Sequence, residues 1–393
     1  MKSLGICVVT HQYGHFWSGV GTYATRLINA LADAGHQVTV LCPVLSQGMA
    51  HPGVTLTEIK GLKFKPTLEN WFLLSYYFNK SIQNLLKEKP VDIIHFVDGR
   101  DSLFCKVKNI PVVGTMNDYY FAEAPKNPLS YRTYYDDWIK RWFFYNFTRV
   151  LEKRAIRRLS FVIANCNYIM NSMIKSYGIR ENLIKVVYYG MDKNEVTVKS
   201  REKEDRLKGM PSLLFVGQNF QRKGLPLLIR AVADVKKVFP EVLIHVVGRV
   251  SMEKEDEMRD LAKSMNIEEN ILFLGQKNND EVRRIFKKAD IFAIPSLIEG
   301  LPWVIFEAME AGIPVIGGDT GGIPEQIKDG VNGFLVKPGD WESLSKKIQQ
   351  LAVDKSCKDR FVQNSYRVLE GFSLKQMVEG TVNVYSTLIR SKR

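Results

Sequence analysis

The chain lacks the features that mark several classes of protein. No stretch of its 393 residues approaches 18 uncharged apolar residues, so the sequence predicts no membrane-spanning helix. The five cysteines are odd in number, scattered and without a C-x-x-C pair, which indicates neither a disulfide framework nor a zinc site. The first apolar run ends at Val9 without a small-residue cleavage site, so we expect no signal peptide. The simplest compartment is the reducing cytoplasm.

The chain has fewer acidic than basic residues, and the difference is larger in the first half than in the second. The net charge is +13; residues 1–200 hold 25 Lys and Arg against 15 Asp and Glu, and residues 201–393 hold 30 against 27. This excess in the first half favours an anionic partner, either nucleic acid or an acidic membrane surface, although a basic protein without such a partner would look the same. No zinc-finger, RNP or helix-turn-helix signature is present, so we predict no nucleic-acid partner.

Short apolar runs alternate with helical patterns along the chain. Several runs are almost continuously apolar, as in parallel strands buried on both faces. The expected strands are Leu4–Val9, Gln37–Cys42, Asp92–Val97, Val112–Met116, Phe161–Ala164, Ile184–Tyr188, Ser212–Val216, Val242–Val247, Ile271–Leu274, Ile291–Ile294, Pro314–Ile316 and Gly333–Val336. Helical segments such as Thr22–Ala34, which ends before Gly35, separate many of them. This alternation predicts an α/β protein with one parallel sheet in each half.

The two halves meet near residues 192–210. The segment KSREKEDRLKG within this stretch is charged and has no apolar face, which is typical of an exposed linker. In open α/β sheets, ligands bind outside the carboxyl ends of the strands, and interfaces between domains are favoured pocket sites. We therefore expect a ligand site in a cleft between two sheets.

A glycine-rich segment, Gly19-Val20-Gly21-Thr22-Tyr23-Ala24, fits the dinucleotide fingerprint G-x-G-x-x-A only as a string. The loop 10–18 separates it from the preceding strand, and the strand Gln37–Cys42 ends without the acidic residue that the fingerprint needs. A nicotinamide or flavin site is therefore excluded. Two glycines just before a helix would let its free N–H groups approach a phosphate, and the alternative is a flexible loop.

A second segment, LLFVGQNFQRKG, places cations after the first strand of the second half. Arg222 and Lys223 follow the strand Ser212–Val216, and a helix follows Gly224. Cations at the carboxyl end of a strand can neutralise a diphosphate and stabilise it as a leaving group. Basic residues near helix starts are common, so this motif alone is weak.

A third segment places two glutamates around a loop and a helix start. Glu299 and Gly300 follow the strand ending at Pro295, and Pro302 suits the first turn of a helix that contains Glu307. The free N–H groups near Gly300 and Leu301 would form an anion site, and the carboxylates would accept hydrogen bonds from sugar hydroxyls. A solvent-facing Glu299 explains its charge equally well, but not why Glu307 lies in an apolar run.

These segments together resemble the retaining glycosyltransferases of family 4. The E-x7-E region of that family is similar to SLIEGLPWVIFEAMEAGIPVIGGDTGGIPEQIKDGVNGFLVKPGD, and its donor loop is similar to VGQNFQRKG. Its N-terminal glycine loop, helix and second strand resemble SGVGTYATRLINALADAGHQVTVL, and its final helix resembles the tail that begins FSLKQMVEG. The resemblance spans the whole chain and is densest in the second half.

The resemblance implies a GT-B fold, in which two Rossmann-like domains with parallel sheets face a central cleft. Residues 1–193 would bind the acceptor, residues 194–210 would form the linker, and residues 211–371 would bind a nucleotide sugar. Residues 372–393, amphipathic in pattern, would form a helix that packs back on the first domain.

Family roles for five residues follow from the same resemblance. Glu307 would bind the ribose, Glu299 the donor sugar hydroxyls and Lys223 the diphosphate. The backbone at Gly300 and Leu301 would bind phosphate at the start of the helix.

Further correspondences concern the first domain and the nucleobase. Gly19 and Gly21 would approach the phosphates and the acceptor, and Gln276 would lie near the nucleobase. Gln218 stands where the family often has arginine, so either Arg222 supplies that charge or phosphate contact rests mostly on Lys223.

Asn117 stands in the stretch Thr115-Met116-Asn117-Asp118, where the family often has histidine in a T-x-H-D pattern. An asparagine can donate a hydrogen bond to a substrate but cannot act as an acid or base. This departure bears on the identity of the donor and acceptor more than on activity.

The expected mechanism needs no metal and no cofactor. The chain has no D-x-D motif, so a helix N-terminus, Lys223 and Arg222 would stabilise the departing nucleoside diphosphate in place of a bridging ion. No carboxylate is clearly placed as a nucleophile. The resemblance implies that the hexose-type sugar keeps its anomeric configuration through front-face attack, with the leaving phosphate accepting the proton of the acceptor.

The segment 131–159 bears on the acceptor. It holds eight Lys and Arg against three Asp and Glu, interleaved with Trp, Tyr and Phe. This composition suits the headgroup region of an anionic membrane, and hence a glycan, lipid-linked or lipopolysaccharide-type acceptor reached from the inner face of the membrane. The alternative is that the aromatic residues are core and the cations are a solvated helix face. An epimerase of the same architecture is a further alternative, but such enzymes lack this combination of motifs.

Overall fold

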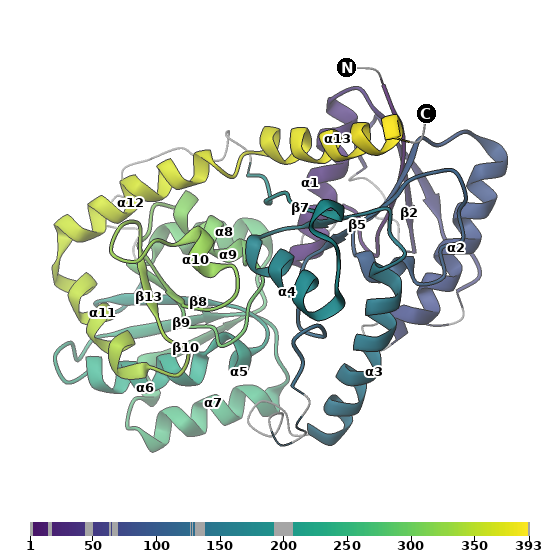
Figure 1. Cartoon of the computed structure of the whole chain (residues 1–393). Helices are drawn as coiled ribbons and strands as arrows, with labels where there is room; N and C mark the ends of the chain where they lie inside the picture. The colour runs from purple at the N-terminus through teal and green to yellow at the C-terminus, as the bar shows by residue number, and fades with distance from the viewer. Residues whose placement is uncertain are drawn as a thin grey trace. The chain divides into compact units, whose positions relative to one another are not determined.

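The computed structural model describes residues 3–14, 18–43, 50–62, 64, 70–125, 127, 129, 138–191 and 207–391. The chain divides into two compact units, the first comprising residues 1–190 with 372–393 and the second residues 191–371 (Figure 1). Most of the charged segment interpreted as a linker lies outside the described residues. No helix in the described ranges is long and apolar enough to cross a membrane.

The first unit contains a seven-stranded parallel sheet with strand order β3-β2-β1-β4-β5-β6-β7. Its strands are β1 (Gly5–Val9), β2 (Gln37–Cys42), β3 (Val54–Glu58), β4 (Ile93–Phe96), β5 (Val112–Met116), β6 (Phe161–Ala164) and β7 (Ile184–Val186). The central strands β4 and β5 are buried at every position, because helices cover both faces of a parallel sheet.

The second unit contains a six-stranded parallel sheet with strand order β10-β9-β8-β11-β12-β13. Its strands are β8 (Ser212–Val216), β9 (Leu243–Val247), β10 (Ile271–Gly275), β11 (Ile291–Ile294), β12 (Val315–Gly318) and β13 (Phe334–Val336). The expected α/β class with two parallel sheets is confirmed, since each of the twelve predicted strands corresponds to a strand in the structure.

Helices connect the strands in both units. Those of the first unit are α1 (Gly19–Asp33), α2 (Trp71–Glu88), α3 (Trp138–Ile156), α4 (Asn167–Tyr177) and α13 (Leu374–Ser391). Those of the second are α5 (Phe220–Lys223), α6 (Leu225–Val235), α7 (Met252–Ser264), α8 (Asn279–Lys288), α9 (Trp303–Glu310), α10 (Ile323–Gln326), α11 (Trp341–Val353) and α12 (Lys355–Glu370).

The strand β3 is the one that the apolar pattern missed. Its sequence VTLTE alternates apolar and polar residues, and it lies at the edge of the sheet, where no residue of the strand is fully buried. An edge strand buries less side-chain surface, so its hydrophobic signal is weaker than that of a central strand.

The C-terminal helix α13 belongs to the first unit, as Figure 1 shows by its place beside α1. Its buried face includes Met377, Val382 and Tyr385, which recur at helical spacing. Gly190 lies so close to the start of this helix that a Cβ atom there would come within 2.5 Å of the Cα atom of Leu374. The helix is therefore packed tightly onto the end of the first half of the chain.

Candidate functional site

Each sheet reverses its strand order at one point. In the first unit this point lies between β1 and β4, and in the second it lies between β8 and β11. The loops that leave neighbouring strands in opposite directions open a crevice there, which is where open α/β sheets bind ligands. Both candidate sites described below lie at the carboxyl ends of these strand pairs.

Arg222 and Lys223, which end α5 after β8, meet Glu299, which follows β11. Lys223 Nζ lies 2.6 Å from Glu299 Oε1, and Arg222 Nη1 lies 3.2 Å from Glu299 Oε2. Arg222 Nη1 also donates a hydrogen bond of 2.8 Å to the carbonyl of Ile298. The Lys223 and Glu299 side chains are only 13% and 7% exposed. The structure thus brings the adjacent cations Arg222 and Lys223 together with a glutamate that lies 76 positions beyond Lys223 in the chain.

The two loops approach each other through the backbone. The N–H of Leu297 donates to the carbonyl of Arg222 at 2.8 Å. Gly224 adopts φ +81°, and a Cβ atom on it would lie 2.1 Å from the Pro295 carbonyl oxygen. Only glycine both tolerates this backbone conformation and leaves room for the neighbouring strand end. The position of Lys223 therefore depends on the glycine that follows it.

The charges of this cluster shift the pKa values of its members. Burial by itself would raise the pKa of Glu299, but Arg222 and Lys223 outweigh it and lower that pKa to about 2. Burial lowers the pKa of Lys223, and Arg222 adds to this effect, while Glu299 and Glu307 oppose it. Glu299 is thus an ionised acceptor of hydrogen bonds, and its two basic neighbours leave the cluster with a net positive charge.

Gly300 and Leu301 lie in the turn that leads into α9. The helix begins at Trp303, with Pro302 as its N-cap residue, so the expectation that Pro302 lies in the first turn was wrong by one position. The Gly300 carbonyl accepts a hydrogen bond of 2.8 Å from the N–H of Gly322, which fixes the turn. Within the described residues, the N–H groups of Gly300 and Leu301 have no recorded acceptor and remain available to a ligand.

Glu307 and Gln276 both lie in segments that follow strands of the second sheet. Glu307 is in the second turn of α9, and its charge raises the pKa of Lys223. Both glutamates therefore lie near that lysine. Gln276 directly follows the edge strand β10 and is exposed. The Gly248 N–H bonds to the Gly275 carbonyl, and a Cβ on Gly248 would come within 1.9 Å of the Gly217 carbonyl oxygen. The ends of β8, β9 and β10 are therefore close together.

The glycines of the first unit lie inside α1, not before it as expected. The helix begins at Gly19, and Ser18 is its N-cap residue. The N–H of Gly21 donates to Ser18 Oγ at 3.0 Å, so it is already occupied in this conformation. Sequence reasoning placed the helix start three residues late, because glycine is an unfavourable helix residue and Ser18 was not read as a cap.

Asn117 follows β5 and uses its amide to join three chain segments. Its Nδ2 donates to the Val97 carbonyl at 2.7 Å, and its Oδ1 accepts a hydrogen bond of 2.9 Å from the Tyr189 hydroxyl. The residue is 9% exposed. Its amide therefore positions the ends of β4 and β5, and its part in catalysis stays a prediction.

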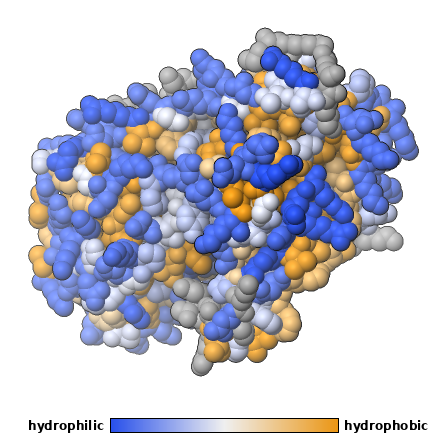
Figure 2. All heavy atoms as spheres, in the orientation of Figure 1, coloured by the Kyte–Doolittle hydropathy of each residue, from blue (hydrophilic) through white to orange (hydrophobic). Residues whose placement is uncertain are grey.

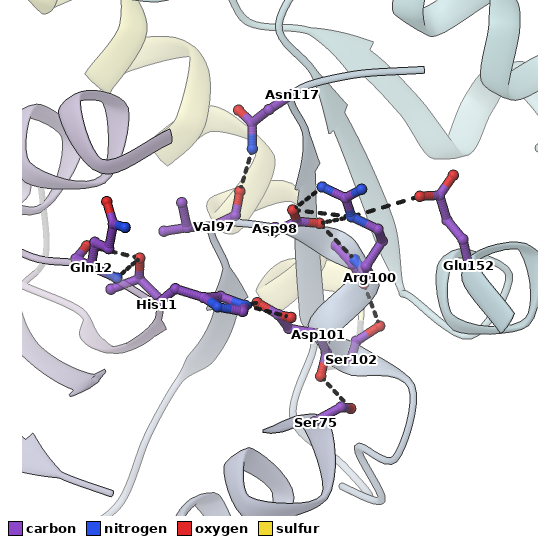
Figure 3. Close-up of polar contacts among 12 residues, drawn as sticks. His11, Gln12, Ser75, Val97, Asp98, Arg100, Asp101, Ser102, Asn117 and Glu152 are labelled. Carbon is purple, nitrogen blue, oxygen red and sulfur yellow. Dashed lines mark hydrogen bonds and ion pairs between the residues drawn. The ribbon is translucent and has the colours of Figure 1, made fainter. Parts of the chain in front are cut away.

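Sequence reasoning missed a buried charge cluster in the first unit, shown in Figure 3. Arg100 Nε donates to Asp98 at 2.9 Å, its Nη2 lies 3.1 Å from Asp118, and its Nε lies 3.6 Å from Glu152 on α3. Burial raises the pKa of Glu152 to about 8, so this carboxyl is mostly protonated at neutral pH. The signal that could have found the cluster is the sequence VDGRD directly after the buried strand β4.

Two family models match the chain, one in each half. The model "Glycosyl transferases group 1" matches residues 197–368, and the model "Glycosyltransferase Family 4" matches residues 17–195. Between them the two models leave only short terminal segments and residue 196 unmatched. An uncharacterised glycosyltransferase from Methanocaldococcus jannaschii is 31% identical over 214 residues, which are 52% of this chain and 54% of that protein. The chain spans about half the length of the first curated relatives that it matches.

Solved structures share the fold over nearly the whole chain. Sucrose-phosphate synthase from Thermosynechococcus elongatus has a TM-score of 0.81 at 18% identity, covering 98% of this chain and 99% of its own. HepE from Anabaena, solved in complex with UDP-glucose, has a TM-score of 0.74 at 19% identity, covering 98% and 100%. At these identities the likeness shows the fold, which is that of the GT-B glycosyltransferases.

Proposed function

Because the chain belongs to the GT-B glycosyltransferases, we propose that it is a retaining, metal-independent enzyme that transfers a hexose-type sugar from a nucleoside-diphosphate sugar. The acceptor in this proposal is a glycan, a lipid-linked sugar or a lipopolysaccharide-type molecule. The observation that carries it is the contact of Lys223 and Arg222 with Glu299, at the point where the second sheet reverses its strand order.

In this proposal, Glu299 pairs with the two cations until the donor diphosphate replaces it. The carboxylate keeps the Lys223 ammonium within 2.6 Å, at the carboxyl edge of the sheet. A diphosphate that enters beside Gly300 and Leu301 carries more negative charge than Glu299 and draws Lys223 and Arg222 to itself. Glu299 is then released to accept hydrogen bonds from the sugar hydroxyls, while Glu307 accepts those of the ribose.

The same cations then act on the leaving group. Negative charge grows on the diphosphate as the bond to the anomeric carbon breaks, and two fixed cations with the free N–H groups stabilise it without reorganising. They supply the positive charge that a bridging metal ion would otherwise provide. The structure of HepE in complex with UDP-glucose supports a uridine diphosphate sugar as the first donor to test.

A donor panel tests this function directly. Purified protein is incubated with UDP-glucose and the other common nucleotide sugars, and the release of nucleoside diphosphate is measured with and without EDTA. We expect release from one donor class, unchanged by EDTA, and NMR of the product should show the anomeric configuration of the donor. Recovery of an epimerised nucleotide sugar, with no diphosphate released, would establish the epimerase alternative instead.

We further propose that α3 carries the enzyme to an anionic membrane surface. Four apolar side chains, Ile139, Phe143, Phe147 and Val150, are more than half exposed and recur along one side of the helix. The Phe72 ring of α2 contacts Phe147 edge-on, with ring centroids 6.3 Å apart. Figure 2 shows hydrophobic and hydrophilic side chains interleaved over the first unit.

The charges around these four apolar side chains complement an anionic surface. The exposed residues Lys140, Arg154, Arg157 and Arg158 lie on or just after α3, and Glu152, the only acidic residue of the helix, is buried. Apolar rings with basic neighbours suit the boundary between lipid headgroups and acyl chains. This proposal places the enzyme on the inner face of the membrane, in the cytoplasm, consistent with five cysteines of which the structure joins none in a disulfide.

Flotation with vesicles tests the membrane proposal. Vesicles containing phosphatidylglycerol should carry the protein upward at low salt, and neutral phosphatidylcholine vesicles should not. Replacing Phe143 and Phe147 by serine should abolish flotation, while the control Met252→Ser, an 83% exposed residue of the second unit, should not. No flotation of the unaltered protein on acidic vesicles at low salt would remove this proposal and leave the transferase proposal intact.

A further inference from the structure

One segment after β12 supports the loop that joins β11 to α9. We call this loop, residues 297–302, the glutamate loop. The N–H of Gly322, the N-cap residue of α10, donates to the Gly300 carbonyl at 2.8 Å. Gln326 Nε2, at the end of α10, donates to the Pro302 carbonyl at 3.1 Å. The turn that leads into α9 is therefore held by two donors from the same short helix.

The planar peptide bond transmits this support to the N–H of Leu301. In a trans peptide, a carbonyl and the N–H of the next residue lie in one plane and point in opposite directions, and the bond from Gly300 to Leu301 is trans. The Gly300 carbonyl points at Gly322, so the Leu301 N–H points away from α10. The ring of Pro302 restricts its own φ, which is −73°, and Gln326 fixes the carbonyl that follows. Leu301 therefore lies between two peptides that are both held in place.

Gln326 is itself fixed by the interior of the second unit. The residue is fully buried. Asn332 Nδ2 donates to the Gln326 backbone carbonyl at 3.0 Å, and Ser365 Oγ on α12 donates to the Asn332 carbonyl at 3.1 Å. Asn332 and Ser365 are buried as well. The amide that holds Pro302 is thus attached to a part of the fold that is packed on all sides.

Stability by itself does not explain a glutamine at this position. The Oε1 atom of Gln326 is buried and has no hydrogen-bond partner within the described residues, which costs free energy. The Pro302 carbonyl does not depend on the glutamine, because it also accepts a hydrogen bond of 3.3 Å from the Ile305 N–H. An apolar side chain would therefore suit the packing better. The contact instead determines the direction in which the turn points.

We propose that Gln326 is a positioning residue for the diphosphate of the donor, because it holds the turn in which the Leu301 N–H faces the ligand. The inference rests on the proposed transferase function and deepens it by naming a residue that acts on binding without touching the substrate. Arg222 and Lys223 attract the diphosphate by charge, which acts over a distance. An N–H group binds a phosphate oxygen only when it is aimed at that oxygen, and the contact with Gln326 provides this alignment.

Calorimetry with the full chain tests the assignment, with UDP, GDP and ADP as the probes. We expect Gln326→Met to weaken binding of the preferred diphosphate by about tenfold, because the Leu301 N–H is no longer aligned with it. Methionine keeps the length of the side chain and removes the unpartnered oxygen, so the thermal midpoint should not fall. Gln349→Met is the matched control, since Gln349 on α11 donates to Ser345 Oγ at 3.1 Å and makes no recorded contact with the glutamate loop within the described residues.

The matching free nucleoside distinguishes a positioning role from a structural one. A nucleoside lacks the phosphates, so Gln326→Met should bind it as the unaltered protein does, as measured by saturation-transfer NMR. A general distortion of the second unit would weaken the binding of both ligands. Gln326→Leu is the second variant, which also lacks the donor and should behave in the same way if the methionine variant does not fold.

The outcomes separate this inference from the proposed function. Weaker binding of the diphosphate, with an unchanged thermal midpoint and unchanged binding of the nucleoside, supports positioning by Gln326. Diphosphate affinity equal to that of Gln349→Met, or an equal loss for both ligands, overturns it, while the donor site stands. If the unaltered protein binds none of the three diphosphates, the donor site and this inference fail together.

Discussion

The Tyr385 hydroxyl of α13 lies 2.5 Å from Nδ1 of His95 on β4, inside the first unit. The other ring nitrogen of His95 lies 2.8 Å from Thr115 Oγ1 on β5. Burial lowers the pKa of His95 to about 3, so the ring is neutral, and one of its nitrogens donates a hydrogen bond while the other accepts one. One buried imidazole thus joins the C-terminal helix to the two central strands of the sheet.

Removing the hydroxyl should loosen this junction. Tyr385→Phe removes the hydrogen-bond partner of His95 Nδ1 in a fully buried position, which costs about 1–3 kcal/mol. The midpoint of urea unfolding should fall accordingly. Tyr76→Phe, at a 58% exposed position, is the control and should leave the midpoint unchanged. Equal midpoints for both variants would contradict the account of this contact.

The same histidine should make stability depend on pH. Its pKa is about 3 when folded and about 6.5 when unfolded, so between these values only the unfolded chain binds the proton. Its contribution to stability is complete above pH 6.5 and is lost at about 1.4 kcal/mol per pH unit as the pH falls toward 3. Urea unfolding at a series of pH values measures this slope. His95→Gln should flatten it, and an unchanged slope in that variant would assign it to other groups.

Lys223→Ala should reduce diphosphate release by about 10²-fold or more, because it removes a fixed cation from the leaving group. Lys237→Ala is the control, since Lys237 is 75% exposed and, within the part of the chain that the structure describes, its one ion pair is with Asp234. The measurement compares the initial rates of diphosphate release by the two variants and the unaltered protein, with the donor that the panel identifies. Near-normal turnover in Lys223→Ala would count against electrostatic stabilisation by this residue.

Gly224→Ala should disrupt the donor site through the backbone. The added Cβ would lie 2.1 Å from the Pro295 carbonyl at a positive φ, so the loops after β8 and β11 must separate and Lys223 must shift from Glu299. Gly275→Ala has a similar φ of +68° but nothing within 4 Å of the new Cβ, so it carries only the cost of a left-handed backbone, about 1–2 kcal/mol. Binding of the nucleoside diphosphate, measured by calorimetry, should weaken in the first variant and persist in the second.

The sequence predicted most strands because burial on both faces leaves continuous apolar runs. It missed β3, where an edge position leaves the alternation too weak to recognise. The sequence also predicted that α1 begins after Gly21. The helix in fact begins at Gly19, because the side-chain cap at Ser18 outweighs the poor helix propensity of two glycines. Local patterns thus predicted the strands that are buried on both faces. They failed at the edge strand β3 and at the start of α1, which a single capping residue determines.

The local order of residues by itself determined the α/β class, the glutamates eight positions apart and the cations after β8, because each is encoded within one strand–loop–helix segment. Only the tertiary structure decided that Glu299 neutralises Lys223, that Arg100 gathers three carboxyl groups, and that Asp101 orients His11. The physical reason is that strands distant in the chain become neighbours when the sheet forms. Ionisable groups 76 or 90 residues apart then share a buried environment in which their interaction is strong.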